Sequence, residues 1–308
     1  MVSKIIFIVG PTATGKTQVG YLLAKKIGGQ IISCDSTLVY REPKIITSKP
    51  PSYMLKEIPH HFVDIISVET SYDVFTYYLE AREVIKNLWN RGVPIVVCGG
   101  SGLYFQAILD GIFEGAGSSF SLREKLRKEA DIKGNLYLYN KLKEVDPQAA
   151  ERISSNDLKR IIRALEVYYT TGETISQRQK KRWGIWSKYP VKIFGFFLRR
   201  NLLYEVINWR TEEMFKKGAV KEVSELIKLN LSITAKKIIG IKEIKSFLEG
   251  NVSLDEAKEA MKRNTRRFAK RQFTWFNREK RLEWIDVEDK TSSYLVEYIL
   301  RNVRNSKN

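Results

Sequence analysis

Residues 10–17 have the residue types and the spacing of a phosphate-binding loop. The run reads Gly10-Pro11-Thr12-Ala13-Thr14-Gly15-Lys16-Thr17 and fits the pattern G-x-x-x-x-G-K-[ST]. In such a loop, backbone N–H groups surround phosphate oxygens, the lysine adds a positive charge and the final hydroxyl binds Mg²⁺. The sequence therefore predicts a site for a phosphorylated compound and Mg²⁺, with Thr17 as the metal-binding residue.

The segments on either side supply the context that this loop requires. Residues 5–9 are all apolar, as in a strand buried on both faces of a parallel sheet. After the loop, apolar residues recur at helical spacing from Val19 to Ile27, and Gly28-Gly29 then ends the helix. The positive end of that helix points at the loop, so strand, loop and helix together form a phosphate cradle.

Two further strands end in polar residues that we expect at the same edge of the sheet. The predicted strand 30–34 runs into Asp35, and the apolar strand 95–98 runs into the glycine-rich turn around Ser101. Side chains just past the carboxyl ends of parallel strands line the ligand site of an open α/β sheet. Two structural interpretations stay open, namely Asp35 as the cap of a turn and the glycine turn as a packing device.

The composition is strongly basic. Lys and Arg number 53 against 35 Asp and Glu, which gives a formal net charge of +18. Such an excess favours a polyanionic partner, above all a nucleic acid, over an enzyme that acts on small anions alone. The alternative is positive charge spread over every surface.

One predicted helix, residues 254–276, concentrates this charge. Its cations are spaced 3, 1, 3 and 1 residues apart, which places all five on one face: Arg263, Arg266, Arg267, Lys270 and Arg271. Because like charges on one stripe repel one another, the stripe favours binding of a phosphate backbone over a merely solvated face. Arg160 and Arg163 share a face of another predicted helix, for which a solvated basic face stays an alternative.

The order of these segments predicts an α/β fold, a P-loop NTPase-like parallel sheet flanked by helices, with an inserted all-helical domain. Composition changes at the glycine- and serine-rich residues 111–121, the pattern from 122 to about 182 is helical, and an apolar strand follows at 191–198. We expect residues 1–114 and 187–308 to form the core and residues 115–186 the insertion. Helices are predicted at 202–214 and 234–250. Residues 42–70 are predicted to be irregular, with loops around a short segment at 62–66.

The sequence also argues against several classes of protein. No stretch of about twenty apolar residues occurs, so we expect a soluble, cytoplasmic protein without a membrane segment. Cys34, Cys98 and two histidines are too few for a structural zinc site of the finger type, and the cysteines are interpreted as apolar filler. His60-His61 is predicted to anchor a loop, and nothing demands more than a monomer.

Eight blocks, in their order along the chain, resemble the bacterial tRNA dimethylallyltransferase (tRNA isopentenyltransferase) family. They are GPTATGKT at 10–17, DSTLVYR at 35–41, PHHFVD at 59–64, GGSGLY at 99–104, VDPQAAERI at 145–153, NDLKRIIRALEVYYTTG at 156–172, GIKEI at 240–244 and TRRFAKRQFTWF at 265–276. The resemblance spans nearly the whole chain.

This resemblance implies a reaction and a set of partners. Members of the family transfer a dimethylallyl group from dimethylallyl diphosphate to the exocyclic amine of adenine at tRNA position 37, next to the anticodon, and release diphosphate. By resemblance, residues 10–17 and Arg210 hold the diphosphate with Mg²⁺, and Asp35 is the general base for the amine. Ser101 occupies the family's usual threonine position near the donor and the amine. The implied acceptor is the anticodon stem-loop of tRNA.

The resemblance and the basic stripe together imply a tRNA-binding set. It comprises Asp35, Ser36, Thr37, Leu38, Ser101, Arg123, Lys159, Arg160, Arg163, Arg267, Lys270 and Arg271. The chain departs from the family pattern at Leu38, where glutamine is usual, and at Glu42-Pro43, which replaces a glycine-containing segment. The link after Gly111 and the inserted domain also look short.

Two rival functions use the same loop. An adenylate isopentenyltransferase, which prenylates free AMP, ADP or ATP, shares the loop and the aspartate but has no use for the basic stripe. A small-molecule kinase or an RNA-binding ATPase often keeps a metal-binding Asp at the end of the strand 95–98, where this chain has no acidic residue.

Overall fold

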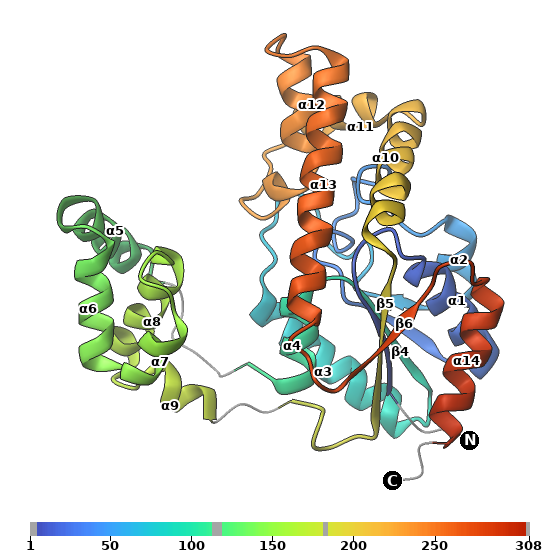
Figure 1. Ribbon diagram of the computed structural model, residues 1–308, viewed down its shortest axis with the longest axis horizontal. Helices are drawn as coiled ribbons and strands as arrows, with labels where there is room; N and C mark the ends of the chain where they lie inside the picture. The colour runs from blue at the N-terminus through green and yellow to red at the C-terminus, as the bar shows by residue number, and fades with distance from the viewer. Residues whose placement is uncertain (1–4, 113–118, 181–183, 306–308) are drawn as a thin grey trace. The chain divides into compact units, whose positions relative to one another are not determined.

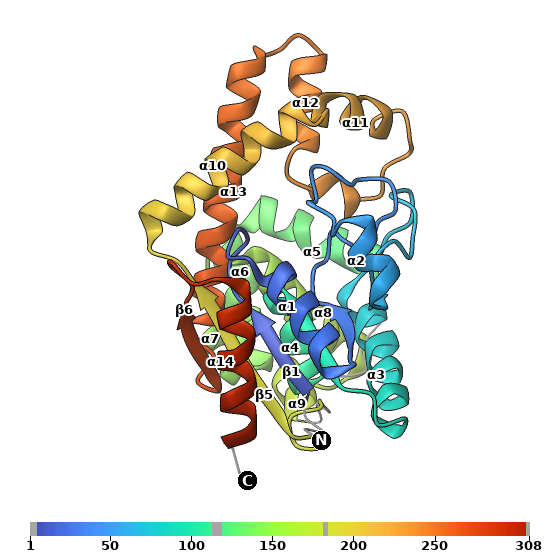
Figure 2. The ribbon, with the colours of Figure 1, turned by 90° about the vertical axis from the view of Figure 1, so that its right-hand side faces the viewer.

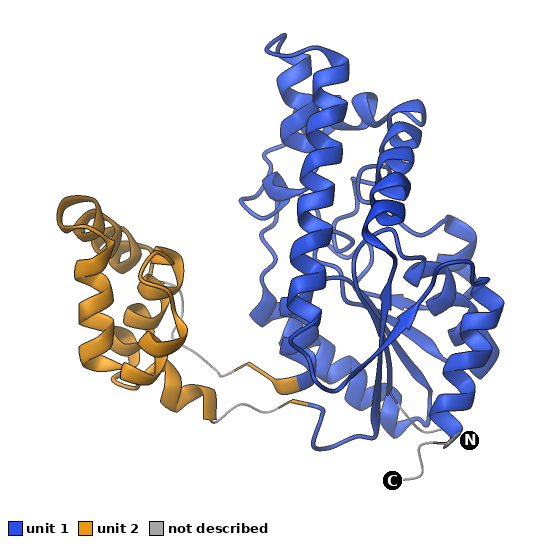
Figure 3. Ribbon diagram, in the orientation of Figure 1, with its two compact units in different colours: residues 1–109, 185–308 blue, residues 110–184 orange. Residues whose placement is uncertain are grey.

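A six-stranded, all-parallel sheet forms the centre of the larger of two compact units (Figures 1 and 3). The computed structural model describes residues 5–112, 119–180 and 184–305. The strands are β1 (Ile5–Val9), β2 (Gln30–Ser33), β3 (His60–His61), β4 (Ile95–Gly99), β5 (Val191–Phe197) and β6 (Leu282–Asp286), in the order β3-β2-β4-β1-β5-β6. The predicted α/β class with a parallel sheet is confirmed.

Helices cover both faces of the sheet, which makes three layers (Figure 2). The alternating side chains of β1 separate the two cores, because successive residues of a strand point to opposite faces. Ile6 and Ile8 pack with α1 (Lys16–Ile27) and α14 (Ser292–Asn305). Ile5, Phe7 and Val9 pack on the other face with α3 (Val74–Asn90) and α4 (Gly102–Asp110). β1 is therefore buried on both sides, as its apolar run predicts.

A group of helices stands above the carboxyl ends of the strands (Figure 1). It includes α10 (Arg200–Lys216), which follows β5, and α13 (Leu254–Phe276), which packs against α10. A capping box starts α13. The backbone N–H of Glu256 donates to the Ser253 hydroxyl oxygen, and the backbone N–H of Ser253 donates to the Glu256 carboxylate. The short helices α2 (Ser52–Glu57), α11 (Ala219–Leu226), η1 (Ala235–Lys237) and α12 (Ile241–Leu248) complete the larger unit.

The smaller unit, residues 110–184, is all helical where the structure describes it. Its helices are α5 (Phe120–Lys133), α6 (Asn135–Val145), α7 (Pro147–Arg152), α8 (Leu158–Thr171) and α9 (Ile175–Lys180). Leu138, Leu142, Ile161 and Leu165 are fully buried in a core of its own. The expected boundary at residues 114 and 115 and the helix end near Arg182 lie outside the described residues.

The sequence predictions were wrong in several places. The single helix predicted at 234–250 is two short helices, because Gly240 has a φ of +108° and interrupts the chain between η1 and α12. The segment 42–70, predicted as loops around a short segment at 62–66, contains α2 and β3. β6 and α14 were not predicted; charged residues interrupt the apolar pattern of β6, which is an edge strand of the sheet.

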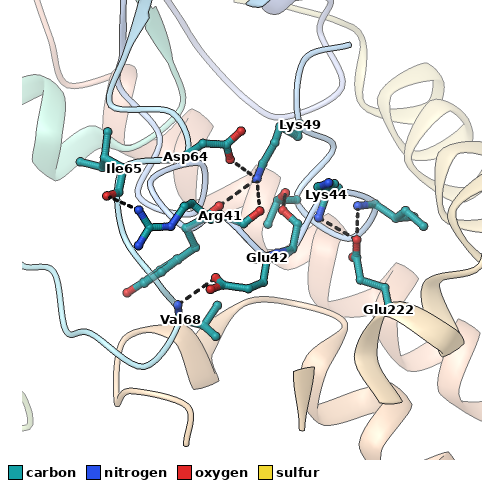
Figure 4. A network of polar contacts seen from close by, with 12 residues as sticks. Arg41, Glu42, Lys44, Lys49, Asp64, Ile65, Val68 and Glu222 are labelled. Atoms are coloured by element: carbon teal, nitrogen blue, oxygen red, sulfur yellow. Dashed lines mark hydrogen bonds and ion pairs between the residues drawn. The ribbon is translucent and has the colours of Figure 1, made fainter. Parts of the chain in front are cut away.

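Polar contacts fix the loop segment that follows Asp35. Lys49 donates to the carbonyl oxygens of Tyr40 and Arg41, both at 2.9 Å, and forms an ion pair with Asp64 (Figure 4). Glu222 of α11 accepts from the backbone N–H groups of residues 44, 45 and 46 at 2.7, 2.8 and 3.0 Å (Figure 4). This chain segment is therefore tied to a helix far along the sequence.

Candidate active site

Four loops meet at the carboxyl edge of the sheet because of its strand order. β2, β4, β1 and β5 are neighbours and run parallel. They lead respectively into Asp35, the turn before Ser101, the loop 10–15 and the start of α10. In an open α/β sheet this edge is where ligands bind. The two polar residues predicted from separate strand ends therefore come to the same edge as the phosphate-binding loop.

The loop 10–15 has the backbone shape of an anion cradle. Gly10, Ala13 and Gly15 have positive φ angles of 132°, 67° and 77°. A side chain at Gly10 would lie 2.4 Å from the carbonyl oxygen of Phe196, so no other residue fits there. α1 begins directly after Gly15, and its first N–H groups face the loop.

Lys16 is buried inside this loop. Its side chain donates to the carbonyl oxygen of Pro11 and lies 3.4 Å from the Thr14 hydroxyl, and the residue is 8% exposed. Burial lowers the pKa of Lys16 from 10.5 to about 8, against the opposing effects of Cys98 and Asp35. No carboxylate among the described residues is in hydrogen-bond contact with this ammonium, so the buried charge is poised to gain from an anion.

Arg210 reaches the same loop from α10. Its guanidinium donates to the Thr12 hydroxyl at 3.2 Å. Burial lowers the pKa of Arg210, and the charge of Asp35 opposes that shift. The charge of Arg210 in turn lowers the pKa of Lys16. Two cations and one carboxylate thus lie within electrostatic reach of one another above the sheet.

Asp35 is partly buried and held in one orientation. Its Oδ1 atom accepts from the backbone N–H of Thr37 at 2.9 Å and from the Thr37 hydroxyl at 2.8 Å. Asp35 therefore caps the turn that follows β2, and the two interpretations left open by the sequence are compatible. Neither of these bonds uses Oδ2. Ser36 is exposed and Leu38 is partly buried in the same turn.

Ser101 directly precedes α4 and lies beside the turn that holds Asp35. Its backbone N–H donates to the carbonyl oxygen of Cys34 at 2.9 Å, and its own carbonyl accepts from Phe105. A side chain at Gly99 would lie 2.2 Å from the same Cys34 oxygen. The glycine turn is thus needed for close packing of the two loops, and that packing brings Ser101 next to the Asp35 turn.

Gln272 of α13 joins the loops and was missed by the sequence analysis. Its side chain accepts from the Thr12 N–H at 2.8 Å and donates to the Gly100 carbonyl oxygen at 2.9 Å. The available signal was a glutamine in the middle of a basic and aromatic block, the run KRQFTWF. The charges and rings of that block predict nucleic-acid binding and do not single out a neutral amide.

The cations of α13 do not all share one environment. Arg263, Arg267, Lys270 and Arg271 are exposed. Arg266 is partly buried, donates to the Asn208 side chain of α10 at 2.6 Å and lies 5.8 Å above the Tyr204 ring. Arg266 therefore differs from the other four cations of the stripe, because α10 packs against that edge of the helix.

Two arginines of the smaller unit have a structural partner. The carboxylate of Glu166 is fully buried and accepts from Arg123 at 2.8 Å and from Arg163 at 2.7 Å. The bond from Arg123 ties α5 to α8, and the bond from Arg163 lies within α8. Lys159 is exposed, as is Arg160, which lies 3.3 Å from Asp157.

The residues near the loop suit a metal that is held mainly by its substrate. Among the described residues, no cluster of three or more His, Cys, Asp or Glu side chains has the arrangement of a metal site. Thr17 is exposed in the first turn of α1. One hydroxyl, with phosphate oxygens and waters, is the usual environment of Mg²⁺ in such loops.

Burial raises the pKa of the Cys98 thiol to about 12, which agrees with the interpretation of this cysteine as an apolar packing residue.

Comparison with known proteins identifies the family. The family model described as IPP transferase matches residues 38–279. The chain is 41% identical to the tRNA dimethylallyltransferase of Alkaliphilus metalliredigens, over 98% of each protein. It is 43% identical to that of Carboxydothermus hydrogenoformans, over 97% of each. The chain belongs to the tRNA dimethylallyltransferase (IPP transferase) family.

Solved structures agree with this family at the level of the fold. The tRNA isopentenylpyrophosphate transferase of Bacillus halodurans is 33% identical with a TM-score of 0.71, and the match covers 98% of this chain and 97% of that one. A eukaryotic dimethylallyltransferase acting on tRNA is 26% identical with a TM-score of 0.80, covering 99% and 80%. As a member of this family, the chain is a transferase that prenylates tRNA adenine from dimethylallyl diphosphate.

Two sequence departures from the family pattern have different structural settings. Glu42 accepts from the backbone N–H of Val68 at 3.0 Å (Figure 4), so it stabilises the loop that it belongs to. Leu38 presents an apolar side chain in the Asp35 turn, and its carbonyl oxygen accepts from the backbone N–H of Asp64.

The described part of the chain contains no helix with the length and hydropathy that a membrane span requires.

Proposed function

We propose that this chain transfers the dimethylallyl group to the exocyclic amine of adenine 37 in the anticodon loop of tRNA. The observation that carries the proposal is the meeting of Lys16, Arg210 and Asp35 above one edge of the sheet. A carboxylate beside two cations provides a proton acceptor next to an anion site. We propose further that the enzyme acts in the cytoplasm and as a monomer.

The diphosphate of the donor would bind to the loop 10–17. Its oxygens would accept from the N–H groups at the start of α1, from the Lys16 ammonium and from the Arg210 guanidinium. These cations stabilise the charge that grows on the diphosphate as its bond to the allylic carbon breaks. Bound Mg²⁺, reached through Thr17, would supply further neutralisation of that charge.

Asp35 would act as the general base. The amine of adenine is a weak nucleophile because its lone pair is delocalised into the ring. As nitrogen forms a bond to the allylic carbon, the carbon–oxygen bond to diphosphate breaks and Asp35 accepts a proton of the amine. The two hydrogen bonds from Thr37 hold Oδ1, which leaves Oδ2 as the oxygen for this proton. Ser101 would hold the amine and the donor in position.

The exposed cations would bind the backbone of the anticodon stem-loop. Adenine 37 has to leave its stack, which requires a few kcal/mol. Phosphate contacts from Arg267, Lys270 and Arg271 would offset this requirement. From the smaller unit we propose Lys159 and Arg160 as phosphate contacts. Arg123 and Arg163 would contribute only through the part of each guanidinium that Glu166 does not occupy.

The transfer of label from dimethylallyl diphosphate tests the acceptor. Unmodified tRNA with adenine at position 37 and AMP are offered in parallel with Mg²⁺. We expect label in tRNA alone. Label in AMP alone would assign the chain to the adenylate-prenylating class. Rapid ATP hydrolysis without a prenyl donor would favour the kinase or ATPase class instead.

The replacement Asp35→Ala tests the base. We expect the single-turnover rate to fall about 10²- to 10⁴-fold, the usual contribution of a general base. The Kd values for diphosphate and for tRNA should change little. The matched control is Asp131→Ala, which removes an exposed carboxylate on α5 that has no part in the candidate site, and its chemical rate should stay within about threefold of the parent. An unchanged rate for Asp35→Ala would reject the assignment.

A further inference from the structure

Gln272 connects three segments that the proposed reaction uses separately. It belongs to α13, which carries the exposed cations, and its side chain is 6% exposed. The amide oxygen accepts from the Thr12 N–H in the phosphate-binding loop, and the amide nitrogen donates to the Gly100 carbonyl oxygen in the turn before Ser101. The amide oxygen and the amide nitrogen of Gln272 therefore each hold one loop, the phosphate-binding loop and the glycine turn.

Thr12 is held from both sides. Gln272 binds its backbone N–H, and Arg210 binds its hydroxyl at 3.2 Å. α13 and α10 supply these two side chains and pack against each other (Figure 2). A small shift of α13 relative to the sheet would thus act directly on Thr12, the third residue of the phosphate-binding loop.

The glycine turn is shaped to admit this side chain. A side chain at Gly100 would lie 2.2 Å from the Gln272 amide nitrogen and 3.1 Å from the Gly10 carbonyl oxygen. Trp275 lies one helical turn after Gln272 on α13, and a side chain at Gly102 would lie 2.3 Å from its ring. α13 therefore packs on the bare backbone of the turn, with side chains of residues 272 and 275.

The same turn of α13 faces outward with its cations. Lys270 and Arg271 are exposed and directly precede the buried Gln272. Phosphates bound to them would restrain α13 at the height where its other face holds Thr12 and Gly100. A ligand that restrains an element shared by two sites changes the affinity of the second site.

We propose that Gln272 is a positioning residue that couples tRNA binding on α13 to diphosphate binding in the loop 10–17. tRNA on the outer face of α13 holds Gln272 in place, Gln272 fixes the Thr12 N–H, and the loop is thereby set for the diphosphate. By reciprocity, diphosphate tightens tRNA binding by the same factor. This inference rests on the proposed function, because it assumes that α13 binds tRNA.

Equilibrium titrations measure this coupling. The Kd of inorganic diphosphate with Mg²⁺ is determined with and without a saturating unmodified anticodon stem-loop RNA, so that no reaction intervenes. For the parent chain we expect the RNA to tighten diphosphate binding at least about fivefold, the lower end for coupled sites. In Gln272→Met, which keeps the length but loses both hydrogen bonds, the factor should fall to about one.

Two further variants keep the test specific. Gly100→Ala would displace the flexible end of Gln272 from the other side, so it should also abolish the coupling. Thr274→Ala lies on the same helix, is exposed and bonds only within the helix, to the Lys270 carbonyl, so it should keep the parent factor. Far-UV circular dichroism and Tm confirm that each variant is folded.

Each outcome has a defined meaning. Loss of coupling in Gln272→Met, with the Kd of each ligand alone within about threefold of the parent, supports the proposal. Retained coupling overturns it, as does a parent chain that binds both ligands independently. A parent chain that does not bind the RNA would overturn the proposed function itself, whereas label transfer to tRNA without coupling would overturn only this inference.

Discussion

Two groups of cations in the larger unit differ in how the chain holds them. Lys16 is 8% exposed and has its pKa lowered by burial, and the pKa of Arg210 shifts in the same direction. Arg267, Lys270 and Arg271 are exposed on α13. Buried cations interact strongly with one well-placed anion, while exposed cations interact weakly and additively with many. The first group suits the leaving diphosphate, and the second suits an RNA backbone.

Removal of one charge from each group should separate their tasks most clearly. In Lys16→Met we expect kcat/KM for the donor to fall about 10²- to 10³-fold, as for the loss of one preorganised donor to a developing anion. The Kd for tRNA should stay within about threefold. In Lys270→Met the pattern should reverse, with a change of a few-fold in tRNA affinity and none in donor affinity. Steady-state and binding assays that show the same profile for both variants would remove the distinction.

The pH dependence of donor binding should report the titration of Lys16 and not that of the exposed cations of α13. With a pKa of about 8, Lys16 loses its proton above that pH in the free enzyme. Since the diphosphate binds the ammonium form, its affinity should be level below pH 8 and weaken about tenfold per pH unit above it. Lys16→Arg, which stays charged, should show no break near pH 8. A break that persists in this variant would belong to another group.

The same shift affects stability in the opposite sense. Because the pKa of Lys16 is lower in the folded protein than in the unfolded chain, the folded protein binds this proton less tightly. Charging the buried ammonium therefore destabilises the ligand-free protein below pH 8. This penalty disappears as the pH rises from about 8 towards 10.5.

Salt should act mainly on the exposed group. The affinity for tRNA should fall steeply with ionic strength, because phosphate contacts release counterions. The double replacement Arg267→Ala with Arg271→Ala should lower the slope of log K against log salt by roughly two phosphates. Donor binding, measured in parallel, should keep its own slope. An unaltered slope for tRNA would mean that Arg267 and Arg271 belong to a solvated face and do not contact phosphates.

The smallest expected effect distinguishes neighbouring arginines of one helix. Arg266 bonds to Asn208 and lies over Tyr204, whereas Arg267 is exposed. We expect Arg266→Ala to lower the free energy of unfolding by about 1 kcal/mol, the value of one hydrogen bond, and to leave the salt slope nearly unchanged. Arg267→Ala should leave the free energy of unfolding nearly unchanged and lower the salt slope. Chemical denaturation and salt titrations of both variants make the comparison.

The sequence determined the local devices of this protein. The phosphate-binding loop, the strand before it and the helix after it are consecutive in the chain, so a short-range pattern defines them. The charges of residues 263–271 follow from helical spacing in the same way. Asp35 and Ser101 were placed at the sheet edge because parallel strands bring their carboxyl ends together.

Only the tertiary structure decided which long-range partners these residues have. Gln272 contacts Thr12 across 260 positions of sequence, and Arg266 contacts Asn208 across 58. Glu166 of α8 engages Arg123 of α5, so a predicted tRNA contact also supports the smaller unit. Spacing along one element fixes which face a residue occupies, but packing of a second element decides whether that face meets solvent or another helix.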